Sequence, residues 1–226
     1  MPGNGLHHFF THLDLEQPAM HVRLCPGVGP ELRFDVVHVR RPPASKTAVE
    51  GLPPELAPLW ARHDGLMLYC DAKWAPPKFQ PRQELEAGAE DLALLRFEPA
   101  DELPRLKRRL ADDVERYETE LPDPNAVPFA TLSMSSDVFA WCPAGVFYLA
   151  VGHPARRIAD SFDTFLEWLI EDPARALMST ASVARFYRDG QQYYPVGFSG
   201  SPASSTSPRR LQTRESSSTG SRTPSR

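Results

Sequence analysis

The sequence predicts an α+β protein, because patterns typical of strands and patterns typical of helices occupy separate stretches of the chain. Residues 19–40 alternate apolar and polar side chains around a turn that contains glycine and proline, which predicts a β-hairpin. Three short apolar runs between residues 130 and 151 predict an antiparallel meander. Residues 101–121 carry apolar side chains at helical spacing, which predicts an amphipathic helix.

Length and charge divide the chain into two parts. Its 226 residues, 41% of them apolar, suffice for one ordinary domain, which we place at residues 1–198. Residues 199–226 consist mainly of serine, threonine, proline, glycine and arginine, so we expect a disordered basic tail. Because this tail holds five arginines and one glutamate, it contributes +4 to the net charge of −4, and the domain carries −8. An acidic domain favours a basic partner and argues against general nucleic-acid binding.

Cysteine usage and hydropathy predict a soluble cytoplasmic protein. Cys25, Cys70 and Cys142 are widely separated in the sequence, which is typical of buried thiols in a reducing compartment. The amino terminus lacks the pattern of a secretory signal, and no apolar run approaches the ~18 residues of a membrane helix. We therefore expect no membrane partner.

The first half of the chain predicts the hairpin and a helix–strand unit. Residues 6–16 fit either a short helix or a surface turn. Residues 52–69 begin with a proline pair that suits a helix start and end in an apolar run typical of a strand. Gly65 suits the residue at which the chain leaves the helix. Pro58 lies inside the helical pattern, so we expect a kinked or two-part segment there.

The second half predicts one loop and several further elements. In order, we expect a proline-rich loop at 71–83, a strand at 92–97 and the helix at 101–121, with Pro104 in its first turn and Pro122 at its end. The meander follows, and then a helix capped by Asp160 or Ser161. After a break at Asp172–Pro173 we expect a helix at 174–188.

Four short motifs occur in a defined order across residues 50–172. Leu52-Pro53 precedes the first helix, and Asp64-Gly65 ends it. Ser136-Asp137 occupies a turn of the meander, and Ile158-Ala159-Asp160-Ser161-Phe162 with Phe165-Leu166 begins the later helix. Together the motifs resemble the SMI1/KNR4 family, which is part of the SUKH superfamily, although Ser136 replaces the more common glycine.

The resemblance implies a fold and a function. The fold would be a mixed, mostly antiparallel sheet flanked by helices. The function would be non-catalytic protein binding, since bacterial members are regarded as immunity proteins that bind and neutralise a cognate toxin domain, often a nuclease or deaminase. The acidic domain agrees with a basic toxin as the partner. A regulatory or scaffolding protein that acts partly through residues 199–226 is the alternative.

Six residues are candidates for partner binding: Trp74 and Phe79 in the proline-rich loop, and Glu84, Glu86, Glu90 and Asp91 in the acidic run that follows it. Aromatic side chains are typical interface anchors, but they also tie loops to a core, and the same choice holds for Tyr193 and Tyr194. The acidic run suits a basic partner or is a solvated surface.

Three other clusters allow a chemical interpretation beside a structural one. His7, His8 and His12 could bind a metal ion or form an exposed terminus. His63 and Cys70 could form a nucleophile pair or a helix-end histidine and a buried thiol. Arg105, Lys107, Arg108 and Arg109 could bind phosphate or form a salt-bridged helix surface. Since no nucleotide-binding, hydrolase or metalloprotease motif is present, we expect neither an enzyme nor a cofactor.

Overall fold

The computed structural model describes residues 4–14, 19–25, 28–73, 75–80, 93–132, 137–178, 186–188 and 190–198. The predicted tail at 199–226 lies outside these residues. The helices are α1 (Asn4–Leu13), α2 (Lys46–Glu50), α3 (Ala57–Arg62), α4 (Leu103–Tyr117), α5 (Phe162–Glu171) and α6 (Pro173–Met178). The strands are β1 (Ala19–Arg23), β2 (Leu32–Arg40), β3 (Leu66–Asp71), β4 (Leu95–Phe97), β5 (Val127–Leu132), β6 (Val138–Cys142), β7 (Gly145–Leu149), β8 (Arg156–Ala159), β9 (Phe186–Arg188) and β10 (Gln191–Phe198). The α+β class predicted from the sequence is confirmed.

The described strands form one antiparallel sheet in the order β8-β7-β6-β5-β4-β3-β2-β1-β10-β9. Each pairing between these strands is antiparallel, whereas we expected a mixed sheet. The reason is that β1 to β8 pair in chain order, and no crossover connection separates one from the next. The predicted hairpin and the predicted meander are both present, as β1–β2 and β5–β7.

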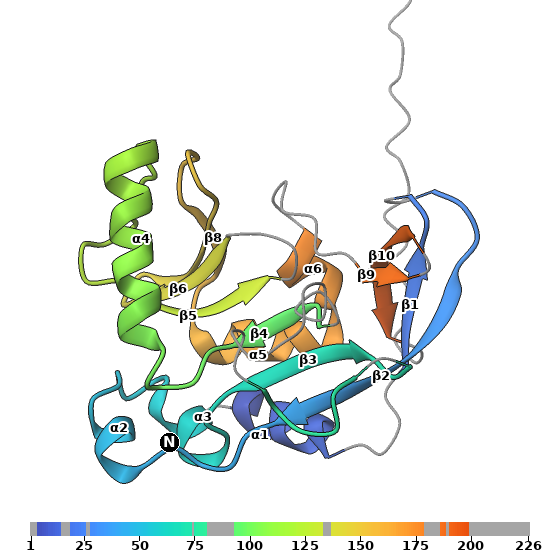
Figure 1. Ribbon diagram of the computed structural model, residues 1–226, viewed down its shortest axis with the longest axis horizontal. Coiled ribbons are helices and arrows are strands. Elements are labelled where there is room, and N and C mark those ends of the chain that lie inside the picture. The colour runs from blue at the N-terminus through green and yellow to red at the C-terminus, as the bar shows by residue number, and fades with distance from the viewer. Residues whose placement is uncertain are drawn as a thin grey trace, which may run out of the picture.

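The sheet curls around α5. This helix contacts β7 and β8 at one end of the sheet and β10 near the other end. Figure 1 shows α5 and α6 between the two ends of the sheet, with β1, β9 and β10 on one side and β5 to β8 on the other. Helix α4 packs against β5 and stands at the edge of the molecule (Figure 1). The core therefore lies on the concave side of the sheet.

Aromatic rings dominate this core. Phe129 lies 5.3 Å from Phe162 and 5.7 Å from Phe165, both with edge-to-face geometry, and 5.7 Å from Phe97. Trp60 is fully buried beside them and donates its indole N–H to the carbonyl oxygen of Glu98 at 3.0 Å. Such ring pairs contribute about 0.5–1.5 kcal/mol each beyond the area they bury.

Residues 6–16 begin as a buried helix rather than a surface turn. Leu6, Phe9 and Leu13 of α1 face the core, and the helix packs against α5. The carboxylate of Asp163 in α5 accepts hydrogen bonds from the backbone N–H groups of Gly5 (3.1 Å) and Leu6 (2.8 Å). A negative charge at a helix N-terminus is favourable, so Asp163 fixes the start of α1 on α5.

Several expectations differ in detail from the structure. The segment around Pro58 consists of a turn at 54–56 followed by α3, which begins at Ala57 and has the proline in its first turn rather than at a kink. Helix α4 ends at Tyr117, before the predicted boundary, because Glu118 adopts a left-handed conformation with φ of 55°. The stretch predicted as a helix to residue 188 ends in a strand, β9, which pairs with β10. Helix α2 and strands β8 and β10 were not predicted.

An irregular pairing joins β2 and β3 near Tyr69. The register shifts between Val37 and Val39, and Tyr69 has a φ of 56°, which is uncommon for a residue with a side chain. The buried Tyr69 hydroxyl donates to the carbonyl of Leu169 at 2.5 Å, and its backbone N–H donates to Nδ1 of His38 at 3.2 Å. These contacts stabilise the unusual backbone conformation.

None of the described helices is long and apolar enough to cross a membrane.

Candidate functional site

A cleft of about 520 Å³ lies between the end of β2, the segment after β4 and the first half of α4. Charged side chains dominate its described lining. Five are arginines: Arg41, Arg96, Arg105, Arg108 and Arg109. Four are carboxylates: Glu98, Asp101, Glu102 and Asp112. We call this feature the arginine cleft.

The centre of the arginine cleft is a buried ion pair. Arg96 and Glu98 are only 5% and 7% exposed, and Nε of Arg96 donates to a Glu98 carboxylate oxygen at 3.0 Å. Leu95 and Phe97 join the main core, while Arg96 projects from the other face of β4, because successive side chains of a strand alternate between its faces. The second oxygen of Glu98 accepts a hydrogen bond from the hydroxyl of the buried Thr131 at 2.9 Å.

The loop after β3 holds the guanidinium of Arg96 from another side. The Phe79 ring lies 4.6 Å from the guanidinium carbon, and the carbonyl of Gln80 accepts from Nη2 at 2.9 Å. The remaining nitrogen, Nη1, is buried and has no hydrogen-bond partner among the described residues. A buried guanidinium nitrogen without an acceptor is uncommon and calls for a physical explanation.

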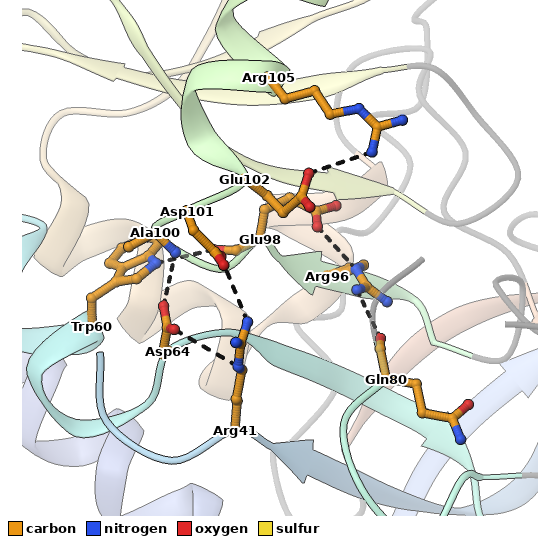
Figure 2. Close-up of polar contacts among 10 residues, drawn as sticks. All are labelled: Arg41, Trp60, Asp64, Gln80, Arg96, Glu98, Ala100, Asp101, Glu102 and Arg105. Atoms are coloured by element: carbon orange, nitrogen blue, oxygen red, sulfur yellow. Dashed lines mark hydrogen bonds and ion pairs between the residues drawn. The ribbon is translucent and has the colours of Figure 1, made fainter. Parts of the chain in front are cut away.

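Weaker and more exposed ion pairs form the rim of the cleft. Figure 2 shows Arg41 between Asp64 and Asp101, with nitrogen–oxygen distances of 3.8 and 3.6 Å. Arg105 lies 3.5 Å from Glu102 within α4 (Figure 2). Asp64 also accepts the backbone N–H of Ala100 at 2.8 Å, which ties the turn after α3 to the segment before α4.

This arrangement favours binding over covalent chemistry. The described residues that line the cleft include no cysteine, serine or histidine that could serve as a nucleophile or base. Arginine is instead the side chain that recognises carboxylate and phosphate groups through paired hydrogen bonds. One signal in the sequence could have revealed the site: a charged pair two residues apart in the otherwise apolar run LLRFE at 94–98.

A second surface feature lies at the end of the β1–β2 hairpin. Leu24, Val28 and Leu32 are 48%, 67% and 40% exposed, and we call these three residues the apolar tip. Tyr117 is the other exposed large apolar residue among the described ones. Beside these residues, Glu31 pairs with Arg23 at 2.6 Å, which links the two sides of the hairpin.

The candidate partner-binding residues separate into two groups. Trp74, Glu84, Glu86, Glu90 and Asp91 lie outside the described residues. Phe79 is described, and it is buried rather than exposed: it packs with Val39, Met67 and Cys70 and beneath Arg96. It therefore acts as a plug that ties its loop to the core. Tyr193 belongs to strand β10 and packs against the main core, with its ring 4.8 Å from that of Phe34.

The paired nucleophile suggested by the sequence is not assembled. Cys70 is completely buried, and burial raises the pKa of its thiol to about 12. Burial lowers the pKa of His63, whose ring lies edge-on to Phe10 at 6.2 Å. A thiol with a raised pKa is a poor nucleophile, so the structural interpretation holds for Cys70.

The three amino-terminal histidines do not converge on one point. His12 faces inward, with its ring 5.5 Å from that of His38, and burial lowers its pKa. His8 instead faces α5, where potential ligand atoms of His8, Glu167 and Glu171 lie within 4.8 Å of one another. These three side chains form a partly exposed surface group.

Comparisons with known proteins add no relative: no protein-family model, no curated protein and no solved structure matches this chain. The fold and the two surfaces are therefore the basis of any functional proposal.

Proposed function

We propose that this chain is a non-catalytic protein-binding module that docks through its apolar tip. The supporting observation is the location of the exposed large apolar side chains. Leu24, Val28 and Leu32 all lie in one hairpin, and among the described residues only Tyr117 is comparable elsewhere. Exposed apolar groups gathered in one place are characteristic of protein interaction sites.

The specific form of the proposal is a cytoplasmic immunity protein of the SMI1/KNR4 type. Its partner would be a toxin domain with a basic surface, of the nuclease or deaminase kind. Two features support this form. The domain at 1–198 carries a net charge of −8, which attracts a basic partner over long range. The helix–strand unit α3–β3 and the meander β5–β7 before α5 also occur in the order that the resemblance implies.

In this proposal the tip supplies affinity and the acidic side chains supply attraction. Buried apolar anchors dominate the stability of most interfaces, whereas peripheral charges mainly raise the association rate. Trp74, Glu84, Glu86, Glu90 and Asp91 stay candidates for the peripheral contacts. Phe79 contributes indirectly, because it holds the start of their loop against Arg96.

The experiment has two steps. Tagged full-length chain is used in its native cells to capture a partner, which is then produced alone in a test bacterium. The proposal expects this partner to stop growth, and co-production of the chain to restore it. A Val28→Asp variant should fail to restore growth, because a charge at the tip opposes burial.

The control is Tyr117→Ser, which removes another exposed large apolar side chain, from α4. It should restore growth as well as the unmodified chain. Equal protection by Val28→Asp would contradict docking through the tip, and a captured partner that is harmless when produced alone would contradict the immunity role.

The alternative is a regulatory or scaffolding protein that works through residues 199–226. The composition of this segment supports it, since Ser207-Pro208 and Thr223-Pro224 suit phosphorylation in a basic chain. Deleting the segment distinguishes the two functions: protection should survive the deletion in an immunity protein, and partner binding should be lost in a scaffold.

A further inference from the structure

The proposed protein docking does not use the arginine cleft, and one buried donor of its central Arg96 has no acceptor among the described residues. We propose that the cleft binds a small molecule through an oxyanion, a phosphate or carboxylate group, with Arg96 as the innermost contact. This site lies on the β4–α4 side of the molecule, and the apolar tip belongs to the β1–β2 hairpin. The inference is therefore independent of the proposed function.

The first observation is the unsatisfied nitrogen of Arg96. Its Nε and Nη2 atoms already donate to Glu98 and to the carbonyl of Gln80. Nη1 has no acceptor, although the side chain is at least nine-tenths buried and lines the cleft. Because Glu98, Gln80 and the Phe79 ring hold the guanidinium in place, its donors are oriented before any ligand arrives, which lowers the entropic cost of binding.

The second observation is the start of α4. This helix has 15 residues, and no side-chain hydrogen bond caps its N-terminus. Glu102 and Arg105 of its first turn line the cleft with Arg96. The positive end of a helix of this length, with N–H groups that lack a side-chain cap, favours a bound anion. Figure 2 shows Arg96 from β4 and Arg105 from α4 on either side of the Glu98 and Glu102 carboxylates.

The lining holds one more arginine than carboxylates. Three of the four carboxylates, Asp101, Glu98 and Glu102, pair with Arg41, Arg96 and Arg105, and Arg41 also pairs with Asp64 outside the lining. Arg108 is exposed on the next turn of α4 and lines the same cleft as Arg96. A volume of about 520 Å³ is in the range of small-molecule sites. The carboxylates at the rim disfavour a continuous phosphate backbone and admit a single anionic group.

Binding of inorganic phosphate to the full-length chain, measured by isothermal titration calorimetry at low salt, tests the inference. Citrate is titrated in parallel, so that a phosphate site and a carboxylate site give different affinities. We expect saturable binding of at least one of the two with one site per chain. The absence of saturation up to about 1 mM of either anion would overturn the inference.

Two arginines of α4 provide a matched pair of variants. Arg108→Gln removes a lining arginine, and Arg116→Gln removes an exposed arginine near the end of the same helix, outside the cleft lining. We expect about a tenfold weaker affinity for Arg108→Gln, the size of one charged hydrogen bond, and no change for Arg116→Gln. Equal losses in both variants would indicate general attraction to a basic helix face and would overturn the site.

Arg96→Lys tests the innermost contact directly. Lysine keeps the positive charge but lacks the planar fork that offers several donors at once. A folded Arg96→Lys protein should lose at least tenfold in anion affinity, and unchanged affinity would overturn the role of Arg96. If this variant does not fold, Arg108→Gln against Arg116→Gln decides the inference.

Discussion

The arginine cleft and the apolar tip both depart from the usual distribution of side chains, in which charged groups face solvent and apolar groups are buried. The cleft buries the charges of Arg96 and Glu98, and the tip exposes the apolar side chains of Leu24, Val28 and Leu32. The buried pair is tied to its surroundings by hydrogen bonds from Thr131 and to Gln80, so removing a partner changes the fold. The three side chains of the tip are exposed to solvent, so the fold tolerates them there without gaining stability from them.

The two regions should therefore respond differently to substitution, the cleft in stability and the tip in binding. Strand β2 joins the two regions, since it begins at Leu32 in the tip and is followed directly by Arg41 in the cleft. Substitutions along this path should change stability strongly at the cleft and at the buried part of β2. At the tip they should change binding and leave stability nearly unchanged.

The largest effect is expected at Arg96. Replacing it with Met leaves the carboxylate of Glu98 buried without a cation, which costs about 3–5 kcal/mol of unfolding free energy. Urea unfolding at pH 7 measures the change. A loss below about 1 kcal/mol would show that the pair behaves like a surface pair. The double variant with Glu98→Gln should recover part of the loss, because the unpaired charge is then absent.

The second effect is an acid sensitivity centred on His38. Burial lowers the pKa of His38 to about 3, with smaller contributions from His12 and Arg40. Below pH 6.5 the unfolded chain binds a proton that the folded chain does not, so stability falls as the pH drops from 6.5 towards 3. Between pH 7 and pH 5, the unfolding free energy of the His38→Gln variant should therefore fall by about 2 kcal/mol less than that of the unmodified chain.

Urea unfolding at these two pH values measures the difference. Glutamine can still accept the backbone N–H of Tyr69, so the irregular pairing of β2 and β3 is kept. An identical pH dependence in the two proteins would mean that burial does not lower the pKa of His38 in the folded chain.

The third effect is small and concerns the rim of the cleft. Arg105 and Glu102 are 3.5 Å apart, with side chains that are 62% and 32% exposed. Exposed pairs of this kind contribute about 0–1 kcal/mol, so Arg105→Gln should lower the unfolding free energy by no more than that. Thermal unfolding in low and high salt checks this. A larger loss would indicate that Arg105 is coupled to the buried ion pair of Arg96 and Glu98.

The smallest effect on stability is expected at the tip. Leu24→Ser, Val28→Ser and Leu32→Ser should each change the unfolding free energy by no more than about 0.5 kcal/mol, as is usual for exposed positions. Their effect on partner affinity should exceed about 1 kcal/mol if these residues are interface anchors. A tip variant that unfolds readily would instead make the apolar tip a structural feature.

Local patterns predicted the elements that local interactions determine. Gly65 has a φ of +105°, which suits glycine, and Ser161 accepts the backbone N–H of Thr164 as a helix cap. Pro104 lies in the first turn of α4, as predicted. These signals are visible in the sequence because the residue that forms each contact lies within a few positions of its partner.

Long-range pairings were the part that the sequence did not reveal. Strand β10 pairs with β1 from the other end of the chain, and β9 forms only because β10 is in place. The burial of Arg96 likewise depends on Phe79, Gln80 and Thr131, which come from two other segments. A pattern within one segment cannot specify which distant side chains will cover a charged residue.

The most direct test of docking through the tip is growth of cells that produce the captured partner together with Val28→Asp or Tyr117→Ser. Folding of both variants is verified beforehand by thermal unfolding. We predict that Tyr117→Ser protects the cells as the unmodified chain does, and that Val28→Asp does not protect them. Full protection by a folded Val28→Asp protein would contradict docking through the apolar tip.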